Sequence, residues 1–146
     1  MTAIQALLIP VGDNMYALDA TAVREVVTEP LPTRVPTAPP WILGVFNLRG
    51  EVVPLFDTAA IIGVGRMTSV TFVVVVTTSV GLAGLVVSGL PQVARLDDHV
   101  GPSDMRCTLG MYAFNNDVAV LLDVEALLVT SSRGTDEDSS RELAHS

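Results

Sequence analysis

Residues 42–62 read ILGVFNLRGEVVPLFDTAAII, and this stretch decides the fold of the chain. Two apolar runs, Val45–Leu48 and Glu51–Leu55, flank the pair Arg49-Gly50. Runs rich in β-branched and aromatic residues on either side of a glycine-containing turn are typical of a β-hairpin. The stretch therefore predicts a hairpin whose turn carries an arginine.

A short helix is predicted directly after this hairpin. Asp57 or Thr58 can cap a helix over Ala59–Ile62, because side-chain oxygens at this position accept hydrogen bonds from the first turn. Gly63 can end it in a left-handed conformation. The unit is thus a hairpin followed by a capped helix.

The same unit occurs twice in the sequence. A shift of 66 positions aligns residues 44–57 with residues 110–123 without a gap. A glycine, an aromatic residue, a turn, an acidic residue, an apolar strand and an aspartate recur in register. Upstream the similarity continues at a shift of 67, which places Ala17 near Gly84. Such internal similarity predicts two copies of one small β unit.

The two copies differ in two charged residues. Arg49-Gly50 becomes Asn115-Asn116, which suits a tight turn equally well because asparagine tolerates a positive φ. Glu25 becomes Gln92, so both charges are missing together from the second copy. We hypothesise that Glu25 and Arg49 touch, since losing one member of a partly buried pair is costlier than losing both. The alternative is that each is an ordinary surface charge, because exposed ion pairs contribute only about 0–1 kcal/mol.

Composition excludes several classes of partner. The formal net charge is -8 and the chain has no lysine, so neither a nucleic acid backbone nor an anionic membrane surface is expected to bind.

The 146 residues predict one domain. Cys107 has no second cysteine to pair with, and Met1–Gln5 lacks a basic region ahead of an apolar one. We therefore expect a cytoplasmic protein without a signal peptide.

The longest uncharged stretch needs a choice between two structures. Ser69–Leu90 is long enough to span a bilayer as a helix. Three glycines and dense β-branching instead favour two buried strands, Val70–Thr77 and Leu82–Val87. The hairpin is the prediction, and a membrane helix is the alternative.

The remaining segments follow from local patterns. Five prolines between Glu29 and Trp41 predict an extended surface connection, because proline lacks a backbone donor. Trp41 is interpreted as a packed lid on a barrel end, with a binding anchor as the alternative. Pro54 implies that its strand has an unpaired side or a bulge. Further strands are expected over Ala3–Val11, Met15–Leu18, Arg24–Thr28 and Gln92–Leu96, a polar loop over Asp97–Arg106, a helix over Val124–Leu128 and a flexible tail over residues 131–146.

One loop gathers side chains of the kind that bind metals: Asp97, Asp98, His99, Asp104 and Cys107. The paired cysteine and histidine spacings of zinc sites are absent, as is the alternation of oxygen ligands in calcium loops. A solvated loop is the interpretation, and no metal or other cofactor is expected. A small metal-dependent hydrolase using Asp97–Cys107 is the alternative from the enzyme class.

Several of these motifs carry a resemblance to a known family. Val23-Arg-Glu-Val26, Gly44-Val-Phe-Asn-Leu-Arg-Gly50, Val53-Pro54 and the closing Leu121–Leu128 resemble the CheW family of chemotaxis coupling proteins. The resemblance covers about residues 3–130. Two departures are Thr58, where leucine would be expected, and the short segment from Asp97 to Thr108.

The resemblance implies an all-β fold of two small five-stranded SH3-like barrels related by a pseudo-twofold axis. It implies a single domain over residues 1–130, with one subdomain at about 8–67 and the other at about 1–7 plus 68–130. The first strand, near Ala3–Leu7, would cross to complete the second barrel.

The function implied is a non-catalytic adaptor at cytoplasmic receptor arrays. It would couple the cytoplasmic tips of methyl-accepting chemoreceptors to the regulatory domain of a CheA-type histidine kinase. Receptor binding would use the apolar groove between the barrels, and kinase binding the barrel ends. A related receptor–kinase pathway, for pilus-driven motility or development, is the alternative within this class.

The expected protein-binding residues are Val23, Glu25, Asn47, Leu48, Arg49 and Gly50. Arg49 would supply a positive contact, with Glu25 orienting it, while Val23 and Leu48 would dock apolar groups. Core packing is the alternative role for Val23 and Leu48. Gly50 serves the turn through its backbone freedom.

Overall fold

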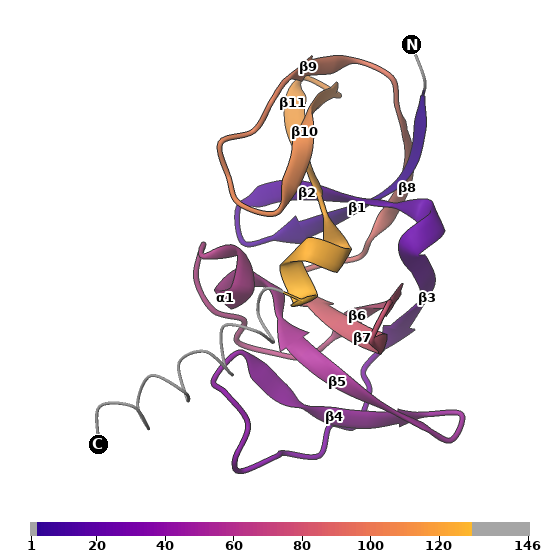
Figure 1. Ribbon diagram of the computed structural model, residues 1–146, viewed down its shortest axis with the longest axis vertical. Helices are drawn as coiled ribbons and strands as arrows, with labels where there is room; N and C mark the ends of the chain where they lie inside the picture. The colour runs from indigo at the N-terminus through magenta and orange to yellow at the C-terminus, as the bar shows by residue number, and fades with distance from the viewer. Residues whose placement is uncertain (1–2, 130–146) are drawn as a thin grey trace.

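The computed structural model describes residues 3–129, which form two antiparallel-rich sheets. The predicted all-β fold is confirmed, and Figure 1 shows the two sheets one above the other. The six-stranded sheet has the order β8 (Gln92–Leu96), β1 (Ile4–Val11), β2 (Asn14–Asp19), β11 (Asp117–Leu122), β10 (Thr108–Phe114) and β9 (His99–Gly101). The five-stranded sheet has the order β3 (Val23–Thr28), β6 (Phe72–Thr78), β7 (Gly81–Val87), β5 (Glu51–Asp57) and β4 (Ile42–Leu48).

The sheets do not follow the two copies in the sequence, because the copies exchange hairpins. β1 and β2, from the first copy, lie between β8 and β11 of the second copy, while β6 and β7 lie between β3 and β5. The two sheets therefore divide the chain differently from the predicted subdomains at about 8–67 and about 1–7 plus 68–130. A two-residue turn, Gly12-Asp13, keeps β1 and β2 paired, so the whole hairpin crosses to the second unit and not its first strand alone.

The predicted duplication is confirmed by matching strand registers. β5 and β7 are parallel with Leu55 opposite Gly84, and β11 and β2 are parallel with Leu121 opposite Ala17. The hairpins β4–β5 and β10–β11 each shift register at their first glycine, Gly44 or Gly110. The two sheets thus repeat one plan, with β9 added to the larger one.

One hydrophobic core joins the two sheets. The inward side chains of β1, including Leu7 and Ile9, pack with Val74 and Leu85 of the other sheet. A helix over residues 124–129 contributes to this core and lies between the sheets in Figure 1. Trp41 also packs against it, which confirms its interpretation as a packed residue. Because the core is shared, neither sheet keeps its buried face without the other.

Both predicted helix caps are present. Asp57 accepts a hydrogen bond from the backbone of Ala60 at 3.0 Å and caps α1 (Thr58–Ile62), which Gly63 ends at φ 92°. Asp123 accepts from the backbone of Ala126 at 3.0 Å at the start of the second helix. In the first turn of each helix, one backbone N–H is therefore satisfied by an aspartate.

The long uncharged stretch forms the hairpin β6–β7, as predicted. No helix within residues 3–129 is long and apolar enough to cross a membrane. The predicted polar loop over Asp97–Arg106 is partly wrong, because β9 forms within it and pairs with β10. This short strand covers the outer edge of β10, and an uncovered strand edge would offer unpaired backbone groups to other chains. The predicted tail, residues 131–146, lies outside the described residues.

Replacing Thr58 with valine is expected to stabilise the protein. Thr58 is completely buried, and its hydroxyl is the one buried side-chain oxygen or nitrogen within residues 3–129 that has no hydrogen-bond partner. A buried hydroxyl without a partner costs about 1–3 kcal/mol, and valine has nearly the same shape. Urea denaturation of Thr58→Val should show a free energy of unfolding about 1 kcal/mol higher. The exposed Thr68→Val serves as the control, and equal stability of parent and Thr58→Val would contradict the expectation.

Tyr16 is expected to make the fold sensitive to alkaline pH. Burial raises its pKa above the usual value of about 10, against a smaller lowering by a hydrogen bond with Asn14. The unfolded chain therefore loses this proton first, and the free energy of unfolding decreases as pH rises above about 10. Tyr16→Phe should flatten this decrease in denaturation series between pH 8 and 11, while Tyr112→Phe should retain it. A decrease of the same steepness in Tyr16→Phe would refute this expectation.

Candidate functional site

An ion pair joins the two outer strands of the five-stranded sheet. Nη1 of Arg49, at the β4–β5 turn, donates to Oε2 of Glu25 on β3 at 2.6 Å. β3 and β4 are at opposite ends of the strand order, so this contact requires the sheet to curl until its edges meet. The hypothesis that Glu25 and Arg49 touch is confirmed, and the pair spans the two outer strands of the curled sheet.

The turn that carries Arg49 has two residues with positive φ. Leu48 pairs with Glu51, which leaves Arg49 at φ 49° and Gly50 at φ 90° as the two turn residues. The backbone N–H of Gly50 donates to Oδ1 of Asn47 at 2.8 Å. Asn47 therefore braces the turn, a role that the sequence interpretation did not assign. The prediction that Gly50 serves the turn agrees with its positive φ.

The second copy shows what such a turn needs. Asn115 and Asn116 take φ 48° and 64°, close to the values at the first turn, with no arginine present. A left-handed conformation costs most side chains about 1–2 kcal/mol, and asparagine is among the exceptions. The turn itself would therefore be better served by asparagine than by Arg49.

The ion pair does not compensate for this cost. The side chain of Arg49 is 72% exposed and that of Glu25 is 24% exposed. An exposed pair of this kind contributes about 0–1 kcal/mol, because water screens it. Stability thus gives no reason for an arginine at this turn. Its guanidinium keeps most of its five N–H donors available, since the structure shows one bond to Glu25.

Val23 and Leu48 both pack against buried residues. Val23 contacts the core shared by the two sheets, and Leu48 contacts the inner cluster of the five-stranded sheet. Both are half-buried, so each combines packing with a partly exposed surface. The six predicted site residues therefore form two sets. Hydrogen bonds join Glu25 to Arg49 and Asn47 to Gly50, while Val23 and Leu48 pack against two different apolar clusters.

Two exposed apolar side chains of the five-stranded sheet and its linker were not predicted. Val52, one residue past Glu51, is 68% exposed, and Leu31 in the linker after β3 is 90% exposed. The sequence signal for Val52 was the alternation along β5, because Val53 and Leu55 are fully buried and Val52 lies on the opposite face of the strand. No comparable signal marks Leu31.

Pro54 has the unpaired side that was predicted, although β5 is an inner strand. Val45, opposite Pro54, directs its N–H and C=O to Thr33 at 2.9 and 2.7 Å, so the proline nitrogen faces away from β4. On that other side, pairing with β7 begins only at Leu55. The nitrogen of Pro54, which has no hydrogen to donate, therefore lies where β5 makes no hydrogen bond to either neighbouring strand.

The loop considered for metal binding is organised by packing. The ring of His99 meets Tyr112 edge to face, with centroids 5.2 Å apart. Within residues 3–129, no group of three or more His, Cys, Asp or Glu side chains is arranged to hold a metal ion.

Comparisons with known proteins agree with the resemblance in the sequence. Residues 5–132 match the sequence model of the CheW-like domain. The chemotaxis protein CheW of Klebsiella aerogenes is 31% identical over 133 residues, covering 84% of this chain and 80% of that protein. The chemotaxis protein CheW of Helicobacter pylori is 30% identical over 127 residues, covering 81% and 77%.

A solved structure shows the same fold. The scaffolding protein TtCheW from Thermoanaerobacter tengcongensis superposes with a TM-score of 0.77 at 22% identity, covering 86% of this chain and 92% of that one. This likeness confirms the predicted fold class of two small β-barrels.

Removing the two charges is expected to cost little stability. Glu25→Gln and Arg49→Gln each remove the ion pair without placing two like charges together, and the double variant lacks both charges. In a double-mutant cycle of urea denaturation, the coupling energy should be below about 1 kcal/mol, because the pair is exposed. A coupling energy above about 2 kcal/mol would show that the pair is a major element of the fold, contrary to this account.

Proposed function

The chain belongs to the CheW-like domain family, and from this premise we propose that it is an adaptor of chemotaxis signalling without catalytic activity. It couples the cytoplasmic tips of methyl-accepting chemoreceptors to the regulatory domain of a CheA-type histidine kinase. The match over residues 5–132 and the likeness to a scaffolding protein support this role. As such an adaptor it acts in the cytoplasm, at receptor arrays.

The observation that carries the proposal is the exposed arginine of the β4–β5 turn. Arg49 has a positive φ, which is strained for an arginine. Its exposed ion pair with Glu25 adds too little stability to offset this strain. A residue kept at a cost to stability is best explained by a contact that it makes with a partner. Glu25 fixes the direction of the guanidinium, which reduces the entropy lost on binding.

The apolar part of the partner surface lies along two sheet edges. β3 is the outer strand of one sheet and β8 that of the other, and both lie on the right of Figure 1. Val26 on β3 is 39% exposed and Val93 on β8 is 75% exposed. In the proposed arrangement, a receptor tip binds along these two edges and buries these side chains, while the kinase domain binds at the barrel ends.

Charge reversal at Arg49 is expected to separate binding from folding. Receptor signalling fragments and the CheA-type kinase of the same genome would be co-sedimented with the parent protein, Arg49→Glu and Arg66→Glu. Arg66 is an exposed arginine in the loop after α1 and serves as the matched control. Arg49→Glu should bind at least about tenfold more weakly, because a like charge then faces the partner's acidic group.

Kinase activity measured in the same samples distinguishes the outcomes. The proposal predicts that the parent and Arg66→Glu join the complex and raise kinase activity, while folded Arg49→Glu does neither. Equal incorporation of Arg49→Glu would refute the Arg49 contact. Failure of the parent protein to bind either partner would refute the adaptor function.

A further inference from the structure

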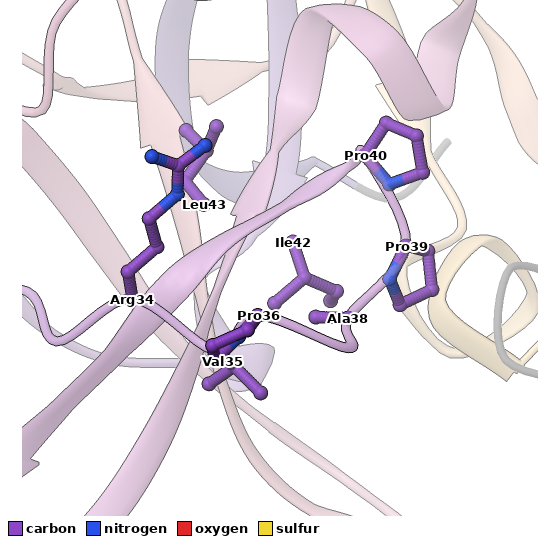
Figure 2. A pocket seen from close by; sticks show the side chains of 8 residues that line it. All are labelled: Arg34, Val35, Pro36, Ala38, Pro39, Pro40, Ile42 and Leu43. Atoms are coloured by element: carbon purple, nitrogen blue, oxygen red, sulfur yellow. The ribbon is translucent and has the colours of Figure 1, made fainter.

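A second surface feature lies at the other end of the β4–β5 hairpin. The proline-rich linker after β3 and the first residues of β4 enclose a hollow of about 640 Å³. Figure 2 shows Arg34 and Leu43 on one side of it, Pro39 and Pro40 on the other, and Ile42 between them. Its lining consists of Arg34, Val35, Pro36, Ala38, Pro39, Pro40, Ile42 and Leu43.

Backbone contacts at both ends of the linker hold the hollow in place. Thr33 exchanges two hydrogen bonds with Val45 of β4, at 2.7 and 2.9 Å, and the carbonyl of Trp41 accepts from Asp57 at 2.8 Å. A side chain at Gly44 would place its Cβ 2.7 Å from the Thr33 carbonyl, so the linker approaches β4 this closely only over glycine. The hollow is therefore formed before any partner arrives, which lowers the entropy cost of binding.

The lining of the hollow combines one positive charge, other polar atoms and apolar side chains. Arg34 is the one charged residue of the eight, and the others are aliphatic or proline side chains. Arg34 is exposed and makes no ion pair within residues 3–129. In a protein of net charge -8, such an unpaired arginine is a local site of attraction for a carboxylate. Three of the lining residues are prolines, which offer no N–H donors to compete for that carboxylate.

We propose that this hollow binds an extended segment of a partner protein that places a carboxylate on Arg34 and apolar side chains against Ile42 and Leu43. That the partner is a protein rests on the proposed adaptor function; the acidic and apolar character follows from the lining. The volume is within the range of ligand sites, about 300–1,000 Å³, and suits two or three side chains.

The hollow and the Arg49 turn can be occupied at the same time. Leu43 and Leu48 are five residues apart on β4, which corresponds to roughly 17 Å along an extended strand. One hairpin thus presents two arginine sites at its two ends, so an adaptor can hold two partners on one rigid element.

Peptide titration of the full chain, followed by NMR of the ¹⁵N-labelled protein, tests this site. The probes are acetyl-Leu-Glu-Leu-amide, its glutamine counterpart acetyl-Leu-Gln-Leu-amide, and sodium acetate. The acidic peptide should shift the signals of Arg34 Nε, Val35, Ala38 and Ile42 in a saturable way, and bind about fivefold more tightly than the glutamine peptide. Arg34→Gln should remove that fivefold difference, whereas Arg66→Gln should preserve it.

Other results would overturn the proposal. They are shifts confined to residues outside the hollow, equal affinity for both peptides, or saturation by acetate at the same concentration as the acidic peptide. The peptide titration contains no receptor or kinase, so its result does not depend on the outcome of the co-sedimentation. Loss of array assembly with intact peptide binding would reject the adaptor function and keep the acidic site.

Discussion

The exchange of hairpins between the two copies is the constraint on which the rest of the structure depends. It is held by two equivalent parallel pairings, Leu55 with Gly84 and Leu121 with Ala17, both at small residues. A Cβ at Gly84 would lie 2.8 Å from a methyl group of Val73 and 2.9 Å from one of Leu55. The close approach of these strands brings the two sheets over one core, which makes the duplicated chain a single packed body.

The two hairpins of the duplicated unit differ in the residues at their turns. Both turns use two residues with positive φ, and both hairpins shift register at a glycine. The second hairpin has residues that suit the turn, Asn115 and Asn116. The first has Arg49 where the second has Asn115, and it braces the turn with Asn47, whose counterpart is Ala113. Comparison within one chain thus shows that this turn can form without an arginine.

Sequence patterns predicted most elements of this fold, for identifiable physical reasons. The helix caps at Asp57 and Asp123 and the turn at Arg49-Gly50 were predictable because local chemistry determines them. The contact of Glu25 with Arg49 could be predicted because both charges are missing together from the second copy. The hairpin exchange was only partly predicted. The resemblance implied that the first strand crosses, but the hydrophobic pattern does not show that β2 and the β6–β7 hairpin also change partners. The strand β9 and the hollow at Arg34 depend on how loops lie over strand edges, which local propensity does not encode.

The central claim is that Arg49 is retained for binding at some cost to stability. The most direct test is Arg49→Asn, which gives the first turn an asparagine like that of the second hairpin. The account predicts that the free energy of unfolding is unchanged or higher, while co-sedimentation with receptor fragments and kinase is lost. A free energy of unfolding lower by more than about 1 kcal/mol, together with unchanged co-sedimentation, would contradict the account and make Arg49 a structural residue.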